Sequence, residues 1–180
     1  MTRMDELMAK ERGPREGARR AGPILDFESF FETNHERLFR ALWLMTRNRD
    51  EAEEVMQDAF LRLWQRWDRV GNGPDPTAYL YRTAMNLWRS RLRRAAVAVR
   101  KVVHQIQRDD EMAVVDQHDV VLRALAPLPP RQRAAVVLLD VLDLSSERAG
   151  EVLGIRPVTV RVLASRARAT LAKEIGDRDE

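Results

Sequence analysis

Cysteine is absent from the 180 residues of the chain, which excludes disulfide bonds and thiolate metal sites. No apolar run approaches the roughly 20 residues that a membrane span needs. The N-terminus also lacks the apolar core of a signal peptide. We therefore expect a cytoplasmic protein with no membrane insertion.

Signatures of catalysis are missing as well. The three histidines, His35, His104 and His118, are isolated in the sequence and lack metal-ligand spacing. No glycine-rich loop of the kind that cradles phosphate is present. We predict that the protein is not an enzyme, and that it has no catalytic residue, no metal site and no cofactor.

Charge, in contrast, is abundant and unevenly placed. The net charge is only +3, although 31 residues are Lys or Arg, so the distribution of charge is more informative than its sum. A hydrophobic content of 44% is enough for one domain of usual size or two small helical ones. Residues 1–23 have few apolar side chains, which predicts a flexible tail.

The strongest helical periodicity runs from about Glu51 to Trp67, with Trp64 and Trp67 on its apolar stripe. Its first turns are crowded with acidic and amide side chains, namely Asp50, Glu51, Glu53, Glu54, Gln57 and Asp58. Carboxylates suit the positive end of a helix dipole, so capping and solvation explain them. A docking face for a basic partner explains them equally well. The sequence leaves both interpretations open.

The charge reverses after a turn at residues 70–76. Between Asp75 and Asp109 the chain has eight Lys or Arg and no carboxylate. A helix predicted over Thr77–Arg94 directs polar side chains away from its buried face, and these include Arg82, Asn86, Arg89, Arg91, Arg93 and Arg94. Such a stripe suits phosphate contacts and readout of a base edge, with a solvated arginine face as the alternative. Residues 95–116 lose this periodicity, which predicts a linker.

Residues 144–171 predict two helices joined by a tight turn. Ser145 is suited to cap the first helix, Gly154 to end it in a left-handed conformation, and Pro157 to open the second. The second helix has an apolar face and no carboxylate as far as Lys173. The side chains suited to meet a duplex are Arg156, Thr159, Arg161, Ser165, Arg166 and Arg168. An ordinary amphipathic hairpin with solvated arginines is the alternative.

In combination these segments resemble the extracytoplasmic-function sigma factors, the two-domain group of bacterial RNA polymerase sigma factors. Residues Asp50–Trp64 resemble the helix that binds core polymerase in this family, and Ala78–Arg94 resemble its minus-ten promoter helix. The segment Leu128–Arg133 resembles its minus-thirty-five domain, as do the later Leu-Gly-Ile, Thr-Val-Arg and Arg-Ala-Arg triplets. The resemblance covers about Phe27 to Ile175.

Pattern and resemblance together predict an all-α fold of two small helical domains joined by a flexible linker, the C-terminal one a helix-turn-helix. The first domain, resembling sigma region 2, is expected over residues 24–94 and the linker over 95–116. The second domain, resembling region 4, is expected over residues 117–176.

The resemblance implies an RNA polymerase sigma factor that directs core polymerase to specific promoters and aids promoter opening. It implies polymerase-binding residues Asp50, Glu53, Glu54, Gln57 and Asp58. It implies minus-ten DNA-binding residues Arg82, Asn86, Arg89, Arg93 and Arg94. It implies minus-thirty-five DNA-binding residues Arg156, Thr159, Arg161, Ser165, Arg166 and Arg168. Core polymerase and promoter DNA are the expected partners, and an anti-sigma factor is a candidate third. A free-standing helix-turn-helix regulator that binds an operator as a dimer is the alternative.

Several positions depart from the family pattern. Gly150 stands where alanine is usual, and glycine inside a helix costs ~1 kcal/mol relative to Ala. We therefore expect the first helix of the motif to be marginal. Val158 replaces a usual glycine, and Val162 with Leu163 replaces a polar-basic pair, which predicts a base-reading face that is less basic than usual.

Overall fold

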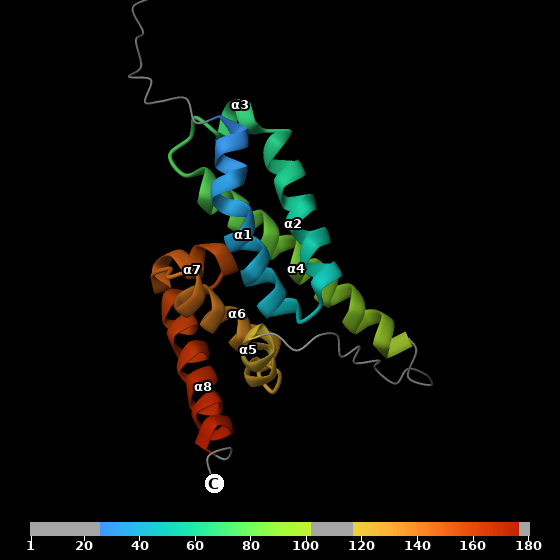
Figure 1. Cartoon of the computed structure of the whole chain (residues 1–180), viewed down its shortest axis with the longest axis vertical. Coiled ribbons are helices and arrows are strands. Elements are labelled where there is room, and N and C mark those ends of the chain that lie inside the picture. Colours follow the sequence, from blue (N-terminus) through green and yellow to red (C-terminus); the bar gives the residue numbers. More distant parts are fainter. Residues whose placement is uncertain (1–25, 102–116, 177–180) are drawn as a thin grey trace, which may run out of the picture.

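The fold is all-α throughout the part of the chain that the computed structural model describes, residues 26–101 and 117–176. In Figure 1 the helices form two groups, α1 to α4 in blue to yellow-green and α5 to α8 in yellow to red. No helix within the described ranges is long and apolar enough to cross a membrane. The predicted tail and most of the predicted linker lie outside the described residues.

The first group consists of α1 (Phe27–Thr46), α2 (Arg49–Trp64), the short α3 (Trp67–Val70) and α4 (Pro76–Lys101). Asp26 caps α1 by accepting hydrogen bonds from the backbone N–H groups of Glu28 and Ser29. Arg47 ends α1 with φ 61°, and Asn48 then caps α2 by accepting from the Glu51 N–H. Helices α1, α2 and α4 enclose a core whose large, fully buried members are Leu38, Leu42, Leu44, Met45, Val55, Leu63, Leu80 and Met85.

The second group consists of α5 (Gln117–Leu125), α6 (Pro130–Val136), the π-helical segment η1 (Val137–Val141), α7 (Ser146–Leu153) and α8 (Pro157–Gly176). The two helices of the predicted motif are α7 and α8. The core of this second group is built from aliphatic residues that are at most 2% exposed, namely Val137, Leu138, Leu142, Val152, Val160, Ala164 and Ala167. The apolar spacing that predicted the second helix of the motif is therefore confirmed at Val160, Ala164 and Ala167.

The two groups pack against each other, mainly through α4 on α7 and α1 on α6 and η1. Guanidinium groups cross this interface: Arg37 of α1 donates a hydrogen bond to the carbonyl oxygen of Leu142, and Arg89 of α4 donates to that of Leu153. An ion pair joins Arg148 of α7 to Asp75, which precedes α4. The buried apolar residues of both groups form one continuous cluster.

One buried arginine lowers the stability of this packing. Arg133 of α6 is only 8% exposed, and its Nε and Nη1 have no hydrogen-bond partner among the described residues. Burial lowers the pKa of the Arg133 guanidinium, and the charge of Arg47 lowers it further. Buried donors without a partner cost free energy, so the packing around Arg133 is less favourable than its apolar area suggests.

Two details differ from the sequence-based expectations. Helix α4 continues to Lys101, seven residues beyond the predicted end at Arg94, because the alanines at 95, 96 and 98 favour helix where the apolar period fades. Trp64 was expected on the buried stripe of α2, but its side chain is 60% exposed. It is the last residue of α2, and its ring lies 6.4 Å, centroid to centroid, from the ring of Phe27.

Candidate functional site

The acidic surface predicted on α2 is present, and we call Asp50, Glu53, Glu54, Gln57 and Asp58 the acidic face. The side chains of Glu54 and Asp58 are 64% and 49% exposed, and Glu53 is 40% exposed. Glu51 instead is half-buried, and burial raises the pKa of its carboxyl although the charge of Arg91 opposes the shift.

A basic residue of α4 neutralises part of the acidic face. Arg91 donates from Nη1 to Glu54 Oε2 at 2.5 Å and from Nη2 to Asp58 Oδ2 at 3.3 Å. The hydrogen bond that Arg91 donates to Glu54 is the main cause that raises the pKa of Arg91. The sequence-based interpretation placed Arg91 on the stripe available to phosphate. The structure corrects this, because the side chain points to α2.

Two exposed apolar side chains extend the acidic face toward the C-terminus of α2. Leu61 is 52% exposed and Trp64 is 60% exposed. Leu61 follows Glu54 and Asp58 at seven and three residues, the spacing of one helical face. Sequence analysis missed both residues because it counted Trp64 toward the core, whereas an interface commonly combines an apolar centre with a charged rim.

The predicted basic stripe of α4 divides into two parts. Arg82, Asn86, Arg93 and Arg94 are exposed. Arg89 is half-buried instead, and it donates both to the Leu153 carbonyl oxygen and to Asn86 Oδ1. Burial is the main cause that lowers the pKa of Arg89, and the charges of Arg93 and Arg131 lower it further. Arg89 thus connects the amide of Asn86 to the C-terminal end of α7.

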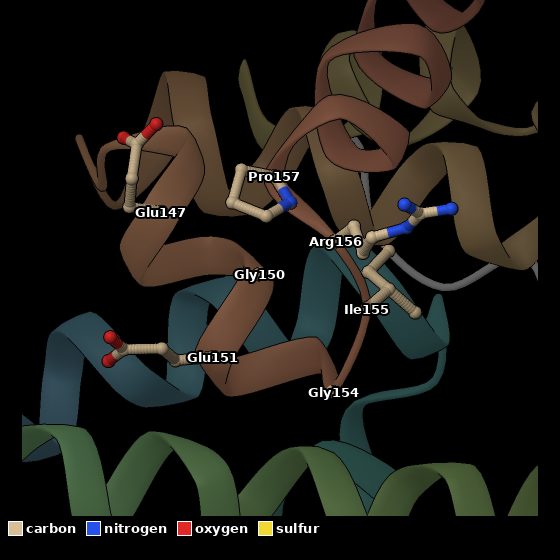
Figure 2. Close-up of a pocket in the computed structure, with 7 residues that line it drawn as sticks. All are labelled: Glu147, Gly150, Glu151, Gly154, Ile155, Arg156 and Pro157. Atoms are coloured by element: carbon tan, nitrogen blue, oxygen red, sulfur yellow. The ribbon is translucent and has the colours of Figure 1, made fainter.

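The turn between α7 and α8 has the predicted capping chemistry. Ser145 Oγ accepts from the Arg148 N–H, Gly154 adopts φ 64°, and Pro157 is the first residue of α8. Figure 2 shows Gly150 facing the segment that leads into Pro157, with the carboxylates of Glu147 and Glu151 directed away from it. A Cβ atom at Gly150 would lie 2.8 Å from the Ile155 carbonyl oxygen. The close approach of the turn therefore leaves little room for a side chain at Gly150.

Two arginines of α8 are held by partners from neighbouring segments. Arg161 donates to Ser146 Oγ at 2.8 Å and lies 3.4 Å from Glu147 Oε1. Arg168 makes a bidentate contact with the Asp140 carboxylate, at 3.1 and 2.5 Å. The hydrogen bonds of this pair raise the pKa of Arg168. The acid-free segment of α8 therefore pairs with two carboxylates from neighbouring segments, those of Glu147 and Asp140.

The remaining predicted residues of the motif, Arg156, Thr159, Ser165 and Arg166, are exposed. Ser165 and Arg166 lie on the side of α8 opposite Val160 and Ala164, where a ligand could approach without displacing α7. Within the described ranges, no group of three His, Cys, Asp or Glu side chains is arranged to hold a metal ion.

Comparisons with known proteins identify the class. The family model for sigma-70 region 2 matches residues 30–97, and the model for sigma-70 region 4 matches residues 118–171. The chain is 33% identical over 159 residues to the ECF RNA polymerase sigma factor SigM of Mycobacterium tuberculosis, covering 87% of this chain and 80% of that protein. It is 28% identical to the RNA polymerase sigma-E factor of Streptomyces avermitilis, covering 88% and 89% of the two chains.

Solved structures show the same fold. The sigma factor RpoE in complex with the anti-sigma factor NepR from Bartonella quintana superposes with a TM-score of 0.70 at 23% identity, covering 84% of this chain and 97% of that one. CnrH in complex with the cytosolic domain of CnrY gives a TM-score of 0.62 at 25% identity, with coverage of 86% and 89%. The chain belongs to the extracytoplasmic-function sigma factors, and the alternative of a free-standing regulator is not favoured.

Proposed function

We propose that this sigma factor binds core polymerase through the acidic face of α2 together with Leu61 and Trp64. The observation that carries the proposal is the exposure of carboxylates and apolar side chains on one side of a single helix. Charged rims steer a partner of opposite sign, and apolar centres supply most of the contact energy. The resemblance to the family implies that the partner is the clamp coiled coil of the largest polymerase subunit.

Two further surfaces are proposed for promoter DNA. Arg82, Asn86, Arg89, Arg93 and Arg94 on α4 are proposed to bind the minus-ten element. Residues Arg156, Thr159, Arg161, Ser165, Arg166 and Arg168 around α8 are proposed to bind the minus-thirty-five element. Run-off transcription from a genomic DNA library by core polymerase, with and without the added chain, tests the whole proposal. Transcripts that start at the same sites in both reactions would contradict it.

The proposed division of labour in α4 gives a direct test. Asn86→Ala should lower discrimination between matched and mismatched minus-ten elements by about 1–3 kcal/mol, because an amide pairs with one base edge and an alanine does not. Arg82→Ala, one turn away, is the matched control and should weaken all promoters equally. Run-off transcription from paired promoter variants measures both. Equal losses on both promoters with Asn86→Ala would assign the amide a structural role.

We also propose an anti-sigma factor as a third partner. The support is that the solved relatives RpoE and CnrH are described in complexes, with the anti-sigma factor NepR and with the cytosolic domain of CnrY. We propose further that the chain acts in the cytoplasm and has no catalytic activity of its own, since the polymerase supplies the chemistry of transcription.

A further inference from the structure

Two valines on α8 are exposed where a soluble helix ordinarily carries polar side chains. Val158 is 50% exposed and Val162 is 44% exposed. They are four residues apart, so they lie on the same side of the helix. That side is opposite the buried Val160 and Ala164, which are both 0% exposed. The first turns of α8 therefore present an apolar strip to the surroundings.

The longer side chains of α8 do not cover this strip. Arg161 is held at the side of the helix by Ser146 and Glu147, and Arg168 is held by Asp140. The nearest followers of Val162 on the exposed side are Ser165 and Arg166. A surface of short side chains flanked by guanidinium groups can approach a partner closely, and the flanking charge selects an anionic one.

The N-terminal half of a recognition helix is the part that reaches base edges in the major groove. The major groove offers one apolar group, the C5 methyl of thymine, which small apolar side chains contact. We propose that Val158 and Val162 read thymine methyl groups in the minus-thirty-five element. This inference rests on the proposed role of α8 in binding that element, and it adds that the two valines make the element specific for thymine.

DNA accounts for the surroundings of the valines better than an apolar protein surface does. The segment from Arg156 to Lys173 contains no carboxylate, and Glu147 and Asp140 are both hydrogen-bonded to arginines. An exposed apolar pair within an otherwise basic helix suits a polyanion that carries isolated methyl groups. A protein partner would instead require a broader apolar patch, of the order of several hundred square ångströms.

The test removes the methyl groups one at a time. Holoenzyme reconstituted from core polymerase and the full chain first selects duplexes from a library that is random in the upstream promoter region. Each thymine of the selected element is then replaced by deoxyuridine, which lacks only the C5 methyl. We expect about a three- to fivefold loss of affinity at one or two positions, the order that burial of one methyl-sized group gives.

The valines should account for that loss. In Val158→Ser or Val162→Ser holoenzyme the same deoxyuridine substitution should have no further effect, because serine carries no methyl group. Val162→Thr, which keeps one methyl group, should retain about half of the discrimination on a logarithmic scale. Circular dichroism should show unchanged helicity, since neither side chain contributes to the core. Arg166→Ala is the matched control on the same side of α8, and it should weaken all sequences alike.

The outcomes separate the inference from the function on which it rests. One outcome would overturn the methyl readout and leave the DNA contact of α8 standing: Arg166→Ala weakens binding, but every deoxyuridine duplex binds like its thymine parent. A selected element without thymine would overturn it as well. Failure of any upstream sequence to be selected, with Arg166→Ala silent, would remove both.

Discussion

Holoenzyme formation should fall about a hundredfold when Glu54→Lys and Asp58→Lys are combined. Both carboxylates are exposed on the acidic face, and reversing them replaces attraction toward a basic partner by repulsion worth several kcal/mol. Titration of labelled chain with core polymerase, at low and at physiological salt, measures the affinity. The loss should shrink as salt screens the repulsion.

Two controls isolate docking from folding in this experiment. Glu32→Lys with Glu36→Lys makes the same charge change at the same spacing on exposed positions of α1, and it should leave affinity within threefold. Arg91→Gln removes the intramolecular partner of Glu54 and Asp58 and should not weaken binding, since it frees both carboxylates. Loss of affinity in the α1 control would show that net charge, and not this face, governs the interaction.

Gly150→Ala should destabilise the fold by about 1–3 kcal/mol, the cost of forcing atoms into a packed site. Intrinsic helix propensity predicts the opposite sign, a gain of about 1 kcal/mol. The structure decides between them, because the added methyl would lie 2.8 Å from the Ile155 carbonyl oxygen and 3.4 Å from the Pro157 nitrogen. The turn cannot retreat easily, since the Ile155 N–H donates to the Gly150 carbonyl oxygen at 3.0 Å.

Thermal unfolding followed by circular dichroism measures this change, at about 2–4 °C for each kcal/mol in a chain of this size. Ser165→Ala, at an exposed position inside α8, is the control that changes propensity without a clash, and it should stay within 0.5 kcal/mol of wild type. A Gly150→Ala chain that melts higher than wild type would show that the turn yields to the methyl group.

Local chemistry made much of this structure predictable from sequence. The helix ends of the helix-turn-helix depend on Ser145, Gly154 and Pro157, whose effects on the backbone are local. Their positions in the sequence were therefore enough to predict the turn. The acidic face was predictable for the same reason, because helical spacing fixes which side chains share a side. The residues alone did not specify its role, and binding to core polymerase is the role that we propose.

Contacts between distant segments were not predictable in this way. Arg91 pairs with Glu54 and Asp58 across more than thirty residues, and Arg168 pairs with Asp140 across 28. Such pairs depend on how helices cross, which periodicity does not specify. Trp64 shows a related error, because the spacing did not show that Leu63, and not Trp64, ends the buried face of α2.

The contact of Arg89 with Leu153 sets a length requirement on the promoter-bound state. Elements centred at minus ten and minus thirty-five are about 25 base pairs apart, which is roughly 85 Å of B-form DNA at 3.4 Å per step. A compact 180-residue body has a radius of gyration of only about 16 Å. Helix α4 packs on α7, and α7 packs on α8. In this arrangement α4 and α8 cannot lie on their two proposed elements at once.

The separation that this requires matches the length of chain available. Residues 102–116 are 15 in number and reach at most roughly 50 Å when extended, to which each helical group adds its own width. Fluorophores on Glu36→Cys and Ala172→Cys, placed in a chain without native cysteine, should therefore move out of transfer range in the promoter complex. Retained transfer would mean that the two groups stay together on DNA. Because of the distance between the two promoter elements, the packed arrangement of the two helical groups and simultaneous binding to both elements are mutually exclusive states of the chain.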